Sequence, residues 1–219
     1  MGHIHRIGLA VLAFGATVTG RSLAQVTDNV SLTKHNLSAT PITGVKNYGE
    51  VCVYCHTPHG GSTQAPLWNR QLPAAGSFTM YTSPTLDMVI GSAPGPVSLA
   101  CLSCHDGSIG LDAITNFPNT ASDTTPSGVR IDGSGRTNGW AKLGTDLRDD
   151  HPVGVTYDIT ADVAFNTLAS AKAAGLRFYG AAANQVECAS CHNPHEEAAA
   201  KRSVCPTTQA VRTPPPLHP

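Results

Sequence analysis

Residues 51–61 read VCVYCHTPHGG, and this stretch decides what kind of fold the chain can form. Two cysteines separated by two residues are followed at once by a histidine, and a second histidine comes three residues later. The first part of the pattern recurs as CLSCH at 101–105 and as CASCH at 188–192. A Cys-x-x-Cys-His run in an exported protein is the attachment signal for c-type haem. The sequence therefore predicts three covalently bound haem c groups.

Two other chemistries use paired cysteines. Three disulfides would suit an exported chain, but they give no reason for a histidine after every second cysteine. Structural zinc combines such pairs into sets of four ligands, and three pairs that each carry a histidine do not divide that way. The predicted attachment residues are Cys52, Cys55, Cys101, Cys104, Cys188 and Cys191, with His56, His105 and His192 as the proximal iron ligands.

The second axial ligand of each iron decides between electron transfer and catalysis. Met80 and Met88 are poor candidates, because both stand in a neighbourhood rich in Ser, Thr and Pro. Histidine is better supplied, and we expect the distal ligands to come from His35, His59, His151 and His195.

His59 and His195 occupy equivalent places, in CHTPH and CHNPH. A histidine three residues after the proximal one does not easily reach the opposite face of the same porphyrin. Each is therefore predicted to ligate a neighbouring haem, the alternative being a surface histidine in a proline turn. The middle motif has Ser108 at this place and is predicted to serve one haem. In DDHPVG (149–154), a turn could present His151 inward, with Asp150 or a carbonyl orienting its other ring nitrogen.

Residues 1–24 have the features of a secretory signal peptide. A short basic start precedes an apolar run at 7–18, and small residues follow up to Ala24. The apolar run is too short to span a bilayer comfortably, and no later segment approaches that length. We expect a haem-binding domain over 25–205 and a disordered, proline-rich tail over 206–219 that contains His218. The protein is predicted to be periplasmic or extracellular.

Composition excludes some partners and limits the core. The formal net charge is −1 and 13% of residues are charged, so there is no electrostatic case for binding nucleic acid or anionic membranes. Only 5% of residues are aromatic, which leaves few large side chains for a conventional core. The predicted fold is mainly irregular with short α-helices, wrapped around a stack of haems. The best helical candidate is 159–176, while 41–49, 94–96 and 116–139 are predicted loops.

Several segments resemble one known group of proteins. They are KHNLS (34–38), CVYCHTPHGG (52–61), PLWNR (66–70), CLSCHDG (101–107), DHPVG (150–154) and CASCHNPH (188–195). In this order they resemble the multihaem c-type cytochromes with paired attachment motifs, which are grouped with cytochrome c3-like and extracellular-filament cytochromes. The resemblance implies haems with two histidine ligands and a role in electron transport. Some members of the group polymerise into filaments outside the cell.

Three classes of function follow from these expectations. The first is a non-enzymatic carrier that passes electrons between other redox proteins. The second is a subunit of a polymeric extracellular cytochrome filament. The third is a reductase that acts on a small oxyanion at an open iron, and the number of histidines argues against it.

The ligand count leaves one histidine over, since four candidates serve three irons. Cys205 is the odd cysteine, and the sequence after it changes character abruptly. One hypothesis is that a fourth haem site has been lost from this end of the chain. The alternatives are that one candidate never ligates iron, or that it reaches a haem in the next subunit of a polymer.

Overall fold

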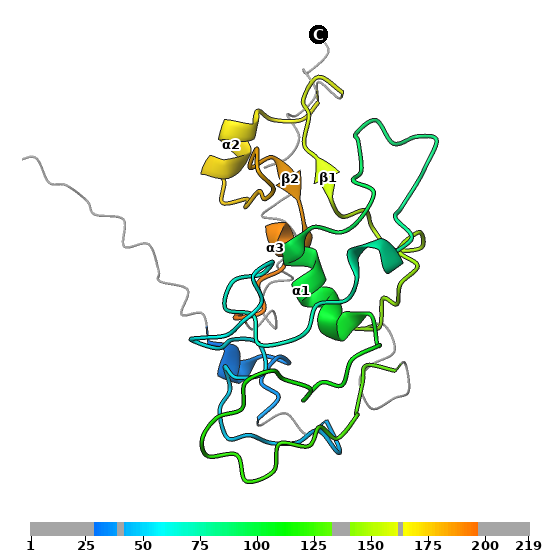
Figure 1. Ribbon diagram of the computed structural model, residues 1–219. Coiled ribbons are helices and arrows are strands. Elements are labelled where there is room, and N and C mark those ends of the chain that lie inside the picture. Colours follow the sequence, from blue (N-terminus) through cyan, green and yellow to red (C-terminus); the bar gives the residue numbers. More distant parts are fainter. Residues whose placement is uncertain (1–28, 39–41, 133–140, 162–163, 197–219) are drawn as a thin grey trace, which may run out of the picture.

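The structure, a computed structural model, describes residues 29–38, 42–132, 141–161 and 164–196 (Figure 1). The predicted signal peptide, the predicted tail with His218, and Cys205 lie outside the described residues.

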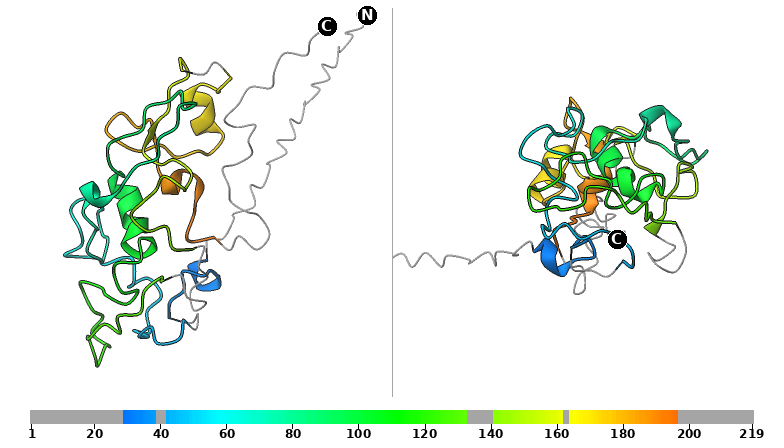
Figure 2. Two further views of the ribbon diagram at one scale, coloured as in Figure 1. Left: turned by 90° about the vertical axis from the view of Figure 1, so that its right-hand side faces the viewer. Right: turned by 60° about the horizontal axis from the view of Figure 1, so that its bottom comes forward.

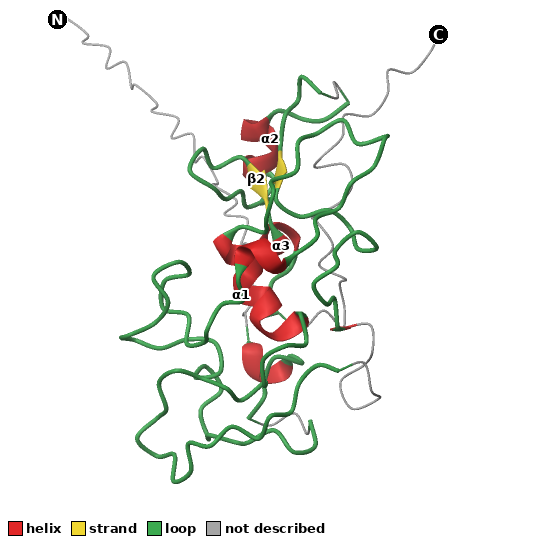
Figure 3. Ribbon diagram, turned by 45° about the vertical axis from the view of Figure 1, so that its right-hand side comes forward, coloured by secondary structure: helices red, strands yellow, loops and turns green. Residues whose placement is uncertain are grey.

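Regular secondary structure is scarce in the described residues, and loops make up most of them (Figure 3). The elements are the 3-10 helices η1 (Val30–Leu32) and η2 (Ala75–Ser77), the α-helices α1 (Pro96–His105), α2 (Leu168–Ala173) and α3 (Cys188–Cys191), and the strands β1 (Val155–Thr156) and β2 (Gln185–Val186). The prediction of a mainly irregular chain with short helices is confirmed.

Helix α1 is the longest element of the described residues and carries the second motif in its last turn and a half. Pro96 occupies its first turn, where a missing N–H costs nothing and a fixed φ favours the helix. The prediction of a loop over 94–96 was therefore wrong at Pro96. The helix ends at His105, and Gly107 follows its C-cap residue Asp106 with a φ of +74° that suits a residue without a side chain.

Helix α2 is much shorter than the helix predicted over 159–176, and that prediction was wrong in length. The Thr167 hydroxyl accepts a hydrogen bond of 3.2 Å from the Ser170 amide, so it caps a helix that begins one residue later. Just upstream, the Tyr157 hydroxyl donates to the Asn166 carbonyl at 2.7 Å and holds the chain in another conformation. Gly175, at φ +98°, follows the end of the helix.

Strands β1 and β2 pair antiparallel, with Val155 opposite Val186. Because α3 begins two residues after β2, this small sheet positions the third motif. Helices α1 and α3 pack against each other, which brings the second and third motifs together near the centre of the molecule (Figures 1 and 3).

Apolar side chains are buried in three small groups rather than in one large core. They are Phe78, Leu99, Leu102, Leu147 and Val153 around α1; Tyr48, Tyr54 and Ile114 beside the first motif; and Tyr157, Ala171 and Leu176 under α2. The described chain is correspondingly extended, with α2 towards one end and the loop after α1 towards the other (Figure 2). None of the helices within the described ranges has the length and apolar character needed to cross a membrane.

Candidate functional site

The first motif is a tight turn held by the segment that follows it. The amide of His56 donates to the Cys52 carbonyl at 2.8 Å, which closes the turn around the two cysteines. The amide of Asn69 then donates to the Cys55 carbonyl at 2.8 Å. The chain between them doubles back, so that the His56 ring meets the Trp68 ring edge-on at 5.6 Å.

Asn69 anchors this turn from inside the protein. Its side chain is fully buried, and its amide nitrogen donates to the carbonyls of Val53 (2.7 Å) and Asn116 (2.8 Å). Its amide oxygen accepts from the Asn116 amide at 2.8 Å. A buried amide with three hydrogen bonds joins the first motif to the loop after α1 in one fixed geometry.

The neighbours of Asn69 reach the second motif. The Trp68 indole donates to the Ser103 hydroxyl at 3.2 Å, and the Arg70 guanidinium donates to the Ser103 carbonyl at the same distance. Ser103 lies between the two cysteines of that motif. The segment PLWNR therefore connects the first two motifs directly.

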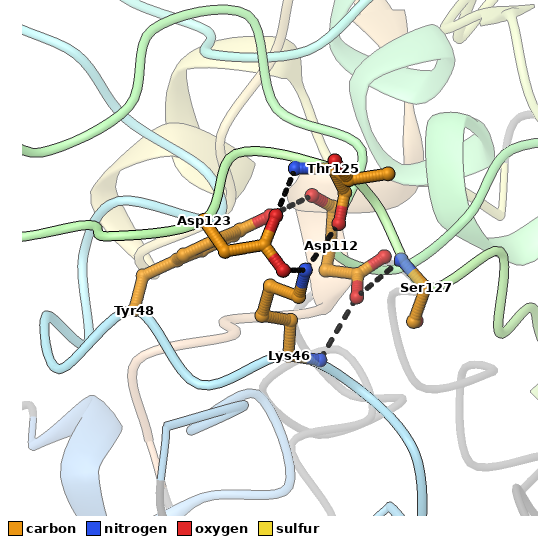
Figure 4. Close-up of polar contacts among 6 residues, drawn as sticks. All are labelled: Lys46, Tyr48, Asp112, Asp123, Thr125 and Ser127. Carbon is orange, nitrogen blue, oxygen red and sulfur yellow. Dashed lines mark hydrogen bonds and ion pairs between the residues drawn. The ribbon is translucent and has the colours of Figure 1, made fainter.

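A polar network holds the loop before the first motif (Figure 4). The buried carboxylate of Asp112 accepts from the backbone amides of Lys46 (2.8 Å) and Ser127 (3.0 Å). The Tyr48 hydroxyl donates to the Asp112 carbonyl at 2.9 Å, and burial together with this aspartate raises the pKa of Tyr48 to about 12. The Lys46 ammonium pairs with Asp123 at the surface.

The third motif is held by a buried carboxyl group. Glu187 is 3% exposed, accepts a hydrogen bond from the Ser98 hydroxyl of α1, and caps α3. Burial raises the pKa of the Glu187 carboxyl above its usual value. The Ser98 hydroxyl also accepts from the Cys188 amide at 3.1 Å, so one serine ties the second and third motifs together.

The motif cysteines form a row that runs through the three motifs. Burial raises the pKa of Cys55 to about 12, and the nearby Cys104 thiol adds to this effect. The Cys101 thiol donates a hydrogen bond to the Cys188 sulfur, which raises the pKa of Cys101 and lowers that of Cys188.

The thiols are not arranged as three disulfides. Cys52, Cys55, Cys101, Cys104 and Cys188 are free, whereas Cys191 is disulfide-bonded. Both sulfurs of the first motif and both of the second are therefore available for thioether bonds in this state. That of Cys191 becomes available only once its disulfide is reduced.

Six histidines of the described residues lie in three pairs, and each pair combines a motif histidine with one from elsewhere in the sequence. The ring centroids are 6.1 Å apart for His56 and His195, 6.3 Å for His105 and His35, and 6.1 Å for His192 and His151. The rings of the first and third pairs are within 15° and 16° of parallel, and those of the middle pair are tilted by 55°. His195 thus stands beside the histidine of a different motif, as the spacing argument requires.

The pair of His105 and His35 interacts electrostatically with one histidine of each of the other two pairs. Burial lowers the pKa of His35, and its neighbours His105 and His195 lower it further. Burial also lowers the pKa of His192, followed by the effects of His151 and His105. The three pairs therefore run in series, and the lowered pKa values of His35 and His192 favour the neutral imidazoles that metal ligation requires.

Hydrogen bonds orient the ring of the middle motif histidine. The His105 Nδ1 lies 2.7 Å from the Ala141 carbonyl, which can only accept, so Nδ1 carries the proton and Nε2 keeps its lone pair. The corresponding contact of His151, from Nδ1 to the Pro152 carbonyl, is longer at 3.4 Å. The ring of His151 therefore bonds to a backbone carbonyl rather than to Asp150.

The loop that carries His195 is joined to the segment that carries His35. The Thr33 hydroxyl donates to the Pro194 carbonyl at 3.2 Å and accepts from the His35 amide at 3.1 Å. One threonine thus places both distal histidines, although they lie at opposite ends of the described chain.

His59 is not brought beside another imidazole in the described part of the chain. It is exposed, and its backbone carbonyl accepts from the Thr57 hydroxyl (2.8 Å) and from the Asn116 side chain (3.1 Å). These bonds fix the turn with the histidine at the surface. The prediction that His59 ligates a neighbouring haem gains no support within one chain.

The three pairs fit a metal that receives its other ligands from a porphyrin. A metal–imidazole bond of about 2.0–2.1 Å, with about 1.1 Å from nitrogen to ring centre, places two opposed imidazole centroids about 6.2–6.4 Å apart. The middle pair, at 6.3 Å, falls within this range, and the two pairs at 6.1 Å lie just below it. Within the described residues, no three or more His, Cys, Asp or Glu side chains are grouped to hold a metal ion. Two imidazoles alone do not complete a protein zinc site.

Sequence reasoning missed the polar residues that position the motifs. Asn69 and Arg70 lie in a segment that was quoted only for its resemblance, and Asp112 and Glu187 were not singled out. Their burial depends on contacts between distant segments, which no local pattern reveals. The only available signal was the position of PLWNR shortly after the first motif.

Comparison of the chain with protein-family models and with curated proteins gave no match.

Proposed function

We propose that this protein is an electron carrier of the multihaem c-type cytochrome class with three haems. The support comes chiefly from one observation: each motif histidine stands opposite a second imidazole at the separation that a six-coordinate metal requires. The proposed axial pairs are His56 with His195, His105 with His35, and His192 with His151. The six motif cysteines would form the thioether bonds.

The chain's own contribution is to close both axial positions. When bound, each haem supplies an iron that exchanges one electron. A distal histidine held in place occupies the position at which a substrate would otherwise bind, and two histidine ligands are typical of electron transfer. The pairing of all three motif histidines therefore favours a carrier over a reductase that needs an open iron.

Localisation and partners follow from the same proposal. Haem of this kind is attached to exported chains, and residues 1–24 have the features of a signal peptide. We place the protein in the periplasm or outside the cell, where other redox proteins would donate and accept its electrons.

The intact mass of protein made in a host that attaches haem c tests this proposal. We expect three haems per chain, with Cys191 in a thioether rather than a disulfide. Two haems and a retained disulfide would overturn the third site, and a folded protein without haem would overturn the proposal as a whole.

Two matched variants test the ligand pairs. His195→Ala and His59→Ala each remove the second histidine of a Cys-His-x-Pro-His segment. We expect His195→Ala to leave three haems attached but to create one high-spin iron that binds carbon monoxide. His59→Ala should leave every iron low-spin. The reverse result would contradict the proposed pairs.

A further inference from the structure

Arg70 is a deeply buried cation that bonds to the second motif and directly follows Asn69, which bonds to the first. Its side chain is 2% exposed. One terminal nitrogen donates to the Leu111 carbonyl at 2.7 Å, and the other donates to the carbonyls of Gly110 (2.6 Å) and Ser103 (3.2 Å). Its Nε is buried without a hydrogen-bond partner among the described residues.

No carboxylate of the described chain neutralises this guanidinium. The ion pairs found there are Lys46 with Asp123 and Arg148 with Asp146, both at the surface. The nearby buried carboxylate of Asp112 accepts from two backbone amides instead. Removing a charge from water without a counter-ion costs several kcal/mol, which three carbonyl contacts offset only in part. Such a charge acts strongly on its surroundings, because water and salt screen it little.

The position of this charge singles out two of the three attachment sites. Asn69, the residue before Arg70, bonds to Cys55, and the Arg70 guanidinium bonds to the residue before Cys104. Burial raises the pKa of both thiols, and the positive charge of Arg70 opposes that rise at each of them. The third motif instead has the buried carboxyl group of Glu187 beside it.

We propose that Arg70 is a potential-setting residue, which raises the reduction potentials of the haems attached through Cys55 and Cys104 above that of the third. This inference rests on the proposed electron-carrier function. Reduction adds one electron from an external donor to the iron and lowers its positive charge by one. A buried cation nearby therefore favours the reduced form. The guanidinium keeps its charge throughout, because arginine is not deprotonated in proteins.

Spectroelectrochemical titration of Arg70→Met tests this, with the exposed Arg148→Met as the matched control. We expect two of the three midpoint potentials to fall in Arg70→Met and none to move in Arg148→Met. The reduced-to-oxidised ratio at a fixed potential should change about tenfold, as expected for one unit charge acting over about 12 Å at an effective dielectric constant of about 20. Three unchanged potentials, or three equal shifts, would overturn the inference.

Arg70→Lys keeps the test decisive if the methionine variant does not mature. A buried lysine loses its proton far more readily than arginine. We expect two potentials to fall as the pH rises from 7 to about 11 in this variant, whereas the third follows the wild type. If all three midpoint potentials of Arg70→Lys followed the pH dependence of the wild type, the charge at this position would have no role in setting them. Haem content and low-spin spectra are measured first, so failure of the proposed function is seen separately from failure of this inference.

Discussion

The first two motifs and the third lie beside buried ionisable groups of different kinds. Arg70 bonds to Ser103 of the second motif and follows Asn69, which bonds to the first, whereas Glu187 connects the third motif to α1. Both are almost completely buried, at 2% and 3% exposure. Arginine keeps its charge in such a place, whereas burial raises the pKa of the glutamate and favours its neutral form. Three motifs of one pattern therefore stand in different electrostatic surroundings, and the difference comes from residues outside the motifs.

The largest expected effect on stability concerns the second motif, in α1. Replacing Cys101 and Cys104 with alanine should remove one haem and destabilise the protein by more than about 5 kcal/mol, beyond the range of ordinary substitutions. The reason is that α1 contacts Trp68, in the segment that holds the first motif, through Ser103, and contacts the third motif through Ser98. Cys188→Ala with Cys191→Ala should also remove one haem but lower the melting temperature less. Equal decreases in the melting temperature of the two double variants would show that α1 does not join the two regions.

The buried amide of the first region is the next most sensitive point. Asn69→Ala leaves buried partners unsatisfied in both the first motif and the loop after α1. We expect a loss of about 2–4 kcal/mol in the free energy of unfolding, measured in urea. The control is Asn193→Ala in the third region, where the side chain accepts one exposed bond from the His195 amide. That change should cost less than about 1 kcal/mol.

Alanine substitution of one glycine after α1 and one after α2 allows the stability of the two helix ends to be compared. Gly107 and Gly175 both have positive φ, so alanine should cost about 1–2 kcal/mol at either position. At Gly107 an added Cβ would also lie 2.5 Å from the Ile131 carbonyl oxygen, whereas nothing lies within 4 Å at Gly175. Gly107→Ala should therefore lower the melting temperature further than Gly175→Ala. Equal decreases in melting temperature would mean that the loop carrying Ile131 moves away from the added Cβ with no loss of stability.

The smallest expected effect is a pH dependence confined to the third region. The pKa of Glu187 is raised in the folded protein above its ordinary value of 4.5. Its favourable contribution is therefore complete below pH 4.5 and is lost as the pH rises through the higher folded value. Urea unfolding between pH 4 and 8 should show this decline in the wild type and a flatter profile in Glu187→Gln. An identical slope in the variant would assign the dependence to other groups.

The motif residues can be proposed from the sequence alone, because the chemistry predicted for them depends on local spacing. The sequence also offered four histidines as candidate distal ligands, and the structure places three of them, His35, His151 and His195, beside motif histidines. The sequence could not choose among the four, because the choice depends on contacts such as that of Thr33 with Pro194.

Helix positions and buried polar residues were predicted less well. Pro96 was taken as part of a loop although it starts α1, and the Ala-rich segment at 159–176 was taken as one helix although Thr167 caps a shorter one. Arginine is a residue type that is usually found at the surface, and only the tertiary fold shows that Arg70 is buried.

The pairing of histidines also bears on how the protein is made. Under the proposed ligation, the first motif emerges early during export, but its second axial ligand, His195, emerges only after the other two motifs. The iron of that site would therefore lack its second imidazole until all three motifs have been translocated. Each axial bond would then act as a cross-link that closes a loop of the chain and reduces the entropy of the unfolded state. The first site would be completed only after the third motif has emerged, even though it is the first to be exported.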